Sequence, residues 1–130
     1  MSGNVLLDSN AAIGLLNGDQ ALTTALTAAA TGIYLPAAVI GELYFGAFNS
    51  GRVSGNIAKL EAFLSANAVL TCDAETGRHY GRIKFDLRRA GRPIPDNDLW
   101  IAACAMQYGL LLATRDAHFQ HVAGLSTITW

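Results

Sequence analysis

Short apolar runs alternate with stretches of helical spacing along almost the whole chain. The run Val5–Leu7 has no polar alternation, which is typical of a strand covered on both faces. We predict similar strands over residues 4–8, 33–35, 68–72, 110–114 and 126–130. Apolar residues at helical spacing predict helices over residues 11–16, 20–30, 36–48, 55–66, 74–90 and 97–108. This order predicts an α/β fold, with helices on both faces of a mostly parallel sheet.

The composition fits a single domain spanning residues 1–130. With 52% apolar residues the chain can bury one core, but it is too short for two. A net charge of −1 argues against a nucleic-acid binder that works through overall positive charge. No apolar run reaches the roughly 20 residues of a membrane-spanning helix, and the first residues lack a signal-peptide pattern. We expect Cys72 and Cys104 to be reduced core thiols in a cytoplasmic protein.

Two acids directly follow predicted strands. Asp8 comes after the first apolar run, and Asp116 comes two residues after the run that ends at Thr114. Ligands of open α/β sheets bind at the carboxyl ends of the strands, so this position favours a functional role. The alternative is structural, because Asp8 or Ser9 is also a suitable cap for the next helix.

Two further acids lie on apolar helices. Glu42 is the only charged residue between Ile33 and Ser50, and its helical neighbours are small or apolar, so we expect it not to be freely solvated. A bound cation or a distant arginine would then balance its charge. Asp98 shares a helix side with Ile101 and Ala102, near the positive end of the helix dipole.

A parallel sheet would let these four acids meet at one edge. Their mutual repulsion, about 1 to 4 kcal/mol per pair at about 4 Å, would be removed by a divalent ion. An oxygen-only set with no histidine or cysteine ligand suits Mg²⁺ or Mn²⁺ rather than Zn²⁺; we interpret His118 as a loop or capping residue. Such a centre can cleave a phosphodiester through an activated water. The predicted metal ligands and catalytic residues are Asp8, Glu42, Asp98 and Asp116.

A local basic strip lies on the predicted helix over residues 74–90. Arg78, Arg82 and Arg89 align on one side of it, opposite a stripe that contains Ile83 and Leu87. Taken alone, such a strip is more typical of a solvated helix face. Beside a nuclease site, it would instead bind the RNA backbone.

Four motifs together resemble those of PIN-domain ribonucleases, and more closely the VapC toxins of bacterial toxin–antitoxin pairs. They are DSN at Asp8, GELYFGA around Glu42, PDNDLWIAACA around Asp98 and TRDAHF around Asp116. The resemblance covers nearly the whole chain. It implies a PIN-like three-layer α/β/α sandwich and a metal-dependent endoribonuclease that uses Mg²⁺ or Mn²⁺. It also implies a homodimer that is neutralised by a small VapB-like antitoxin.

The resemblance also implies roles for individual residues. The four acids correspond to the family's acidic quartet. Ser9 and Asn10 would orient Asp8, and Thr114 would support Asp116. Asp96 is interpreted first as a helix cap and second as a contributor to the metal site. Arg115 stands where a smaller polar residue is common, which leaves its role open.

Two other functions compete with this interpretation. A haloacid-dehalogenase-like phosphohydrolase also begins with an aspartate after a strand, but it needs a second aspartate where this chain has Asn10, and a well-placed later lysine is missing. A non-catalytic RNA-binding module would keep the fold without the chemistry, yet all four acids are present. Binding of RNA without cleavage, with or without Mg²⁺, would identify that module.

Overall fold

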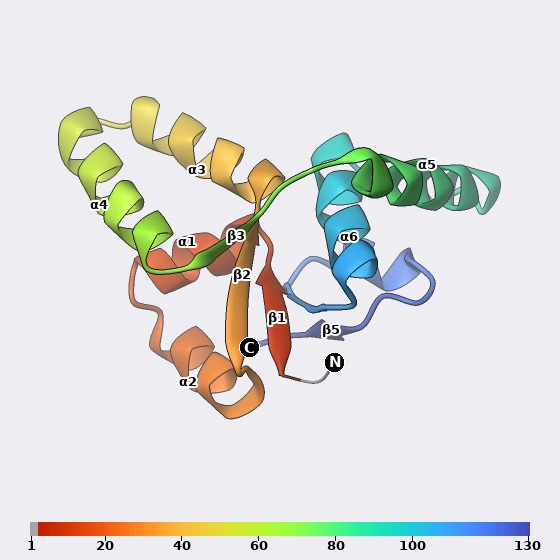
Figure 1. The fold of residues 1–130 in the computed structure, drawn as a ribbon, viewed down its shortest axis with the longest axis horizontal. Helices are drawn as coiled ribbons and strands as arrows, with labels where there is room; N and C mark the ends of the chain where they lie inside the picture. Colours follow the sequence, from red (N-terminus) through yellow and green to blue (C-terminus); the bar gives the residue numbers. More distant parts are fainter. Residues whose placement is uncertain (1–2) are drawn as a thin grey trace.

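The computed structural model describes residues 3–130 as a parallel sheet flanked by helices (Figure 1). The described elements are, in chain order, β1 (Asn4–Leu7), α1 (Ser9–Leu16), α2 (Gln20–Ala29), β2 (Gly32–Pro36), α3 (Ala37–Phe48), α4 (Val53–Ser65), β3 (Ala68–Leu70), α5 (Ala74–Arg89), α6 (Asp96–Tyr108), β4 (Leu111–Ala113), the 3-10 helix η1 (Ala117–His121) and β5 (Thr127–Ile128). The α/β prediction is confirmed, and the architecture is consistent with a three-layer α/β/α sandwich.

The five strands pair in the order β3-β2-β1-β4-β5, and every pairing is parallel. After β1 the chain crosses to β2 and β3 on one side, and after α6 it returns to β4 and β5 on the other. β1 and β4 are therefore neighbours at the point where the strand order reverses. In open α/β sheets this is the point where a ligand-binding crevice forms, beyond the carboxyl ends of the strands.

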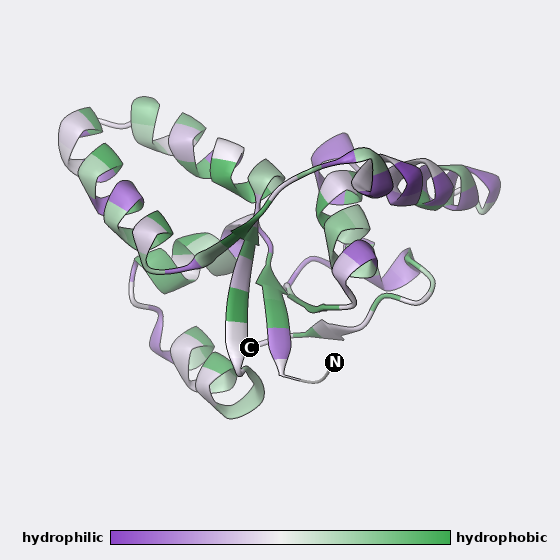
Figure 2. Cartoon of the chain, viewed as in Figure 1, coloured by the Kyte–Doolittle hydropathy of each residue, from purple (hydrophilic) through white to green (hydrophobic). Residues whose placement is uncertain are grey.

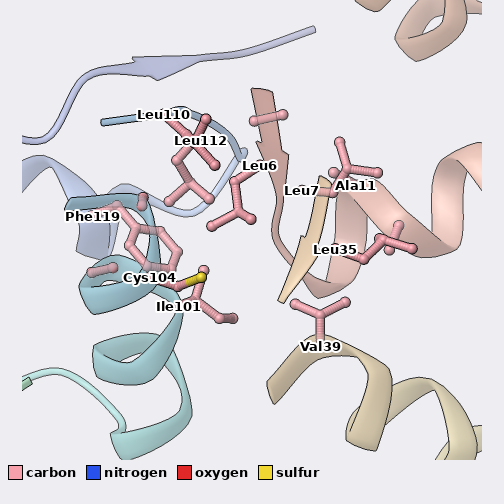
Figure 3. Packing of buried hydrophobic residues seen from close by; sticks show 14 of the residues in the cluster. Leu6, Leu7, Ala11, Leu35, Val39, Ile101, Cys104, Leu110, Leu112 and Phe119 are labelled. Carbon is pink, nitrogen blue, oxygen red and sulfur yellow. The ribbon is translucent and has the colours of Figure 1, made fainter. Parts of the chain in front are cut away.

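The core lies on both faces of the central strand. Leu6 and Leu7 of β1 are fully buried, and because successive strand residues point to opposite faces, they contact different layers. Figure 3 shows Leu6 on the side of Ile101, Cys104 and Phe119, and Leu7 beside Ala11. Burial on both faces explains why β1 has no polar alternation.

Helix ends follow signals that are visible in the sequence. Asp73 accepts hydrogen bonds from the backbone of α5, and Thr76 completes a capping box. Gly109 ends α6 in the left-handed conformation, at a φ of 65°. Figure 2 shows α5 as a largely hydrophilic helix, whereas β1 and α6 are mostly apolar.

Some details differ from the prediction. β3 stops at Leu70, so Cys72 is exposed and is not a core thiol, although Cys104 is buried. Both cysteines are free. Pro36 ends β2 and precedes α3 instead of lying in the helix's first turn.

Among residues 3–130, no helix combines the length and apolar character that crossing a membrane requires.

Candidate active site

The carboxyl ends of β1 and β4 place the first and last acids side by side. Leu7 pairs with Ala113, and the next residue on each strand is Asp8 and Thr114. The Asp8 backbone N–H donates to the Ala113 carbonyl at 3.2 Å, so the segments that follow β1 and β4 stay side by side beyond the sheet. The topology thus explains why residues about a hundred positions apart meet.

Thr114 connects Asp8 with Asp116. Its hydroxyl donates to Asp8 Oδ2 at 2.6 Å and accepts the backbone N–H of Asp116 at 2.9 Å. The other Asp8 oxygen, Oδ1, accepts the backbone N–H of Ala11 at 2.8 Å. Asp8 therefore caps α1 and also faces the site, so the capping alternative and the functional one are compatible.

Asp98 joins this pair from the first turn of α6. Its Oδ2 lies 3.3 Å from Nδ1 of His118, and the same nitrogen lies 3.1 Å from Oδ1 of Asp116. One ligand atom from each of Asp98, Asp116 and His118 lies within 4.8 Å of the other two. The first turn of α6 and the start of η1 thus meet at the end of β4.

The electrostatics of the site are those of crowded, partly buried carboxylates. Burial raises the pKa of Asp8 above its ordinary value, while the hydrogen bonds from Thr114 and Ala11 oppose that rise. Burial is also the main cause that raises the pKa of Asp98; the contact with His118 opposes it, and the charges of Asp116 and Asp8 add to it. The three aspartates therefore interact electrostatically and lack a compensating arginine or lysine within 4.0 Å in the described part of the chain.

Glu42 is placed differently from the prediction. Its side chain is exposed, because α3 buries the stripe of Val39, Leu43 and Ala47 and turns the face with Glu42 and Phe45 outward. The expectation that Glu42 is not freely solvated was wrong, because its small and apolar neighbours lie with it on the exposed face of α3. Glu42 remains tied to the site, because the Ser9 hydroxyl at the start of α1 donates to its Oε1.

The supporting residues divide into those that serve the site and those that do not. Thr114 supports Asp116 as expected, whereas Ser9 contacts Glu42 instead of Asp8. Asn10 is exposed, and only its backbone N–H acts on Asp8. The Nε of Arg115 donates to the Trp130 carbonyl at 2.7 Å, and its guanidinium lies 4.6 Å from the centre of the Trp130 ring, so it anchors the segment after β5.

Asp96 is not a helix cap. It is the first residue of α6, and Pro95 occupies the capping position without a side-chain hydrogen bond. Asp96 instead accepts the Tyr80 hydroxyl at 2.8 Å and lies 3.6 Å from Nζ of Lys84, so its side chain joins α6 to α5. It is also absent from the group that includes Asp98.

The basic strip is exposed on α5, but two of its members pair on their own helix. Arg78 forms an ion pair with Glu75, and Arg82 lies 3.1 Å from Asp86. Arg89 has no acidic partner within 4.0 Å among residues 3–130 and lies 5.6 Å from the Phe85 ring. Own-helix pairs reduce the positive charge that the strip offers to a polyanion.

The residues at this edge fit a divalent cation. Asp98 and Asp116 offer oxygens at ligand spacing, and Asp8 adds a third carboxylate that interacts with both. Mg²⁺ and Mn²⁺ prefer carboxylate oxygens in such numbers. The sequence was interpreted as placing His118 in a loop or at a cap. Its closeness to Asp116 in TRDAHF is visible locally, but only the tertiary structure brings Asp98 to the same nitrogen.

Comparison with known proteins agrees with this geometry. The family model of the PIN domain matches residues 5–125. "Ribonuclease VapC2" of Haemophilus influenzae is 38% identical over 92 residues, which cover 70% of each protein. "tRNA(fMet)-specific endonuclease VapC" of Shigella flexneri is 39% identical over 90 residues, which cover 68% of each.

A solved structure extends the similarity to nearly the whole fold. The chain superposes on a protein of the DNA-bound VapBC complex from Salmonella typhimurium with a TM-score of 0.90, at 27% identity and 98% coverage of both chains. The match to PIN domains removes the haloacid-dehalogenase-like alternative. Sheet order, acidic edge and relatives agree, and the chain belongs to the PIN-domain family as a VapC-type endoribonuclease toxin.

Proposed function

We propose that this protein cleaves RNA phosphodiester bonds by a metal-dependent hydrolysis at the acidic edge of its sheet. The observation that carries this proposal is the meeting of Asp98 and Asp116 at ligand spacing where the strand order reverses, with Asp8 joined to Asp116 through the Thr114 hydroxyl. A Mg²⁺ or Mn²⁺ ion bound there would hold the scissile phosphate, lower the pKa of the attacking water and stabilise the leaving oxygen.

The chain's own residues hold and orient this centre. Asp8, Asp98 and Asp116 act as the metal-holding acids, and Glu42 either completes the set or positions the attacking water. Thr114 fixes Asp8 and Asp116 through one hydroxyl, and Ser9 fixes Glu42. No side-chain nucleophile is required, because the attacking group is water.

Arg78, Arg82 and Arg89 are the proposed contacts to the RNA backbone. Arginine binds phosphate by paired N–H donors, and all three side chains are exposed on α5. The pairs that Arg78 and Arg82 make with their own helix are solvent-exposed and weak. A phosphate can therefore displace Glu75 or Asp86 at little cost in free energy.

The proposed partners are a VapB-like antitoxin and a second copy of this chain, in the cytoplasm. A groove between α1, α3 and α4 is a candidate binding site for a segment of the antitoxin. Apolar side chains line it, among them Ile13, Leu16, Leu43 and Leu60. Phe45 and Phe48 of α3 are 70% and 63% exposed. Large exposed aromatic side chains of this kind mark protein-binding surfaces.

Cleavage of RNA by the purified protein tests the proposed activity. RNA is incubated with wild type and Asp8→Asn, each with Mg²⁺, with Mn²⁺ or with EDTA. We expect new RNA ends only for wild type with a metal. Asp86→Asn, an exposed change on α5, is the matched control for loss of one carboxylate and should keep cleaving. A folded Asp8→Asn protein with full ribonuclease activity would falsify the proposed site.

A pull-down with the antitoxin tests the aromatic patch formed by Phe45 and Phe48 on α3. Phe45→Ser with Phe48→Ser should abolish antitoxin binding and leave RNA cleavage and the mass of the homodimer unchanged. Light scattering of the free protein measures that mass. If the double variant becomes monomeric and still binds antitoxin, the aromatic patch belongs to the homodimer.

A further inference from the structure

His118 occupies the space between two of the metal-holding acids. Its Nδ1 lies 3.1 Å from Asp116 Oδ1 and 3.3 Å from Asp98 Oδ2. The backbone fixes this position, because the His118 N–H donates to Asp116 Oδ1 at 2.9 Å and so places the residue in the first turn of η1. The family's acidic quartet assigns no role to this imidazole.

The two separations match those between neighbouring ligands of one ion. With metal–ligand bonds of about 2.1 Å, adjacent ligand atoms in octahedral coordination lie about 3.0 Å apart. The ligand atoms of His118, Asp98 and Asp116 all lie within 4.8 Å of one another, so small side-chain movements would bring all three into contact with one ion. The His118 side chain is 49% exposed, which leaves room for Nε2 to carry its proton toward water.

We infer that His118 is a nitrogen ligand of the ion at this centre and that it makes the site prefer Mn²⁺ over Mg²⁺. This inference rests on the proposed function, since it concerns the same ion. Mg²⁺ strongly prefers oxygen ligands, whereas imidazole suits transition metals. The oxygen-only ligand set expected from the sequence is thus replaced by a mixed oxygen and nitrogen set.

Pulsed electron paramagnetic resonance of Mn²⁺ tests the ligand directly. Metal-free protein is loaded with Mn²⁺ alone, and the spectrum is searched for coupling to a directly bound imidazole ¹⁴N. We expect this coupling in wild type and its loss in His118→Asn, whose side-chain oxygen takes roughly the place of Nδ1. His121→Asn is the control, because His121 lies in the same 3-10 helix but contacts Arg92.

Calorimetric titration tests the metal preference. His118→Asn should weaken Mn²⁺ binding about tenfold, and Mg²⁺ binding by less than about threefold, as the loss of one partner around a metal typically costs tenfold or more. His121→Asn should change neither affinity. Equal losses for both ions in His118→Asn would overturn the preference.

The outcomes separate this inference from the proposed function. If Mn²⁺ binds and RNA is cleaved but no ¹⁴N coupling appears, His118 is not a ligand and the acidic site stands. If neither Mn²⁺ nor Mg²⁺ binds and no RNA is cleaved, both proposals fail. The wild-type spectrum decides the question even if His118→Asn does not fold.

Discussion

At the scale of single residues, the Thr114 hydroxyl is the most connected group in the site. It is buried, donates to Asp8 and accepts from the backbone of Asp116. We expect Thr114→Val to lower the free energy of unfolding by about 1–3 kcal/mol, because the buried Asp8 carboxylate and the partly buried backbone N–H of Asp116 lose their partner. The same change should weaken Mn²⁺ binding, since Asp8 and Asp116 lose their common support. Urea unfolding and calorimetric titration measure the two effects.

Thr114→Ser is the matched control for that change. Serine keeps the hydroxyl and loses only a methyl group, so metal affinity should stay near that of wild type. The assigned role would be wrong if the valine variant bound Mn²⁺ as tightly as the serine variant.

Asp8 also predicts a pH dependence of stability. Burial raises its pKa above the ordinary 3.8, so between the unfolded and the folded pKa the folded state binds more protons. The stability of the metal-free protein should therefore fall as pH rises through that window. Asp8→Asn removes the cost of the buried charge. We expect its Tm to exceed that of wild type at pH 7, with a gap that closes as pH falls below the ordinary carboxyl pKa.

Thermal unfolding of both metal-free proteins across this pH range measures the gap. Burial also raises the pKa of Asp98, so Asp8→Asn should keep the part of the pH dependence that Asp98 contributes. A variant less stable than wild type at neutral pH would show that the hydrogen bonds of the carboxylate outweigh its desolvation.

At the scale of elements, the start of α5 is held by its capping residue, Asp73, which a side chain of α6 also contacts. Asp73 Oδ1 accepts the backbone N–H groups of Glu75 and Thr76 and an N–H of Gln107 on α6 at 2.9 Å. Asp73→Ala should cost about 0.5–2 kcal/mol of unfolding free energy, the usual effect of losing such a cap. Asp86→Ala on the same helix breaks only an exposed ion pair and should cost less.

The basic strip of α5 predicts a salt-dependent affinity for RNA. Each phosphate contact to single-stranded RNA contributes about 0.7 to the slope of log affinity against log salt. Replacing Arg78, Arg82 and Arg89 by Gln should therefore lower the slope by about 2 and leave metal binding unchanged. Filter binding of uncleaved RNA in EDTA measures the slope. An unchanged slope would show that the strip is only a solvated helix face.

At the scale of the whole molecule, the proposed ion would stabilise the folded state. The acids proposed to bind it are the caps of α1 and η1 and a first-turn residue of α6, and these meet only in the folded chain. An ion at 100 times its dissociation constant should therefore raise the unfolding free energy by about 2.7 kcal/mol. Calorimetry with Mn²⁺ and with EDTA measures the gain, and Asp116→Asn should lose most of it. Equal gains in wild type and variant would place the ion elsewhere.

The contacts of three residues could not be predicted from the sequence. Glu42 lies among apolar residues in the sequence but on the exposed face of α3. Asp96 precedes an apolar helix as a cap would, yet its partner is Tyr80 of α5. His118 had no helical metal motif around it, and its contact with Asp98 spans 20 residues. Each depends on contacts with another element, which local spacing does not encode.

The sequence by itself determined the order and type of the main elements, and it singled out Asp8, Asp98 and Asp116 as acids placed at strand ends or a helix start. Buried parallel strands require continuous apolar runs, and helix ends require capping residues, so both are visible locally. Only the tertiary structure decided how the acids are arranged. The reversal of strand order brings Asp8 beside Thr114, and the return of α6 brings Asp98 to His118. The strand order, and with it the chemistry of the site, depends on packing between elements far apart in the chain.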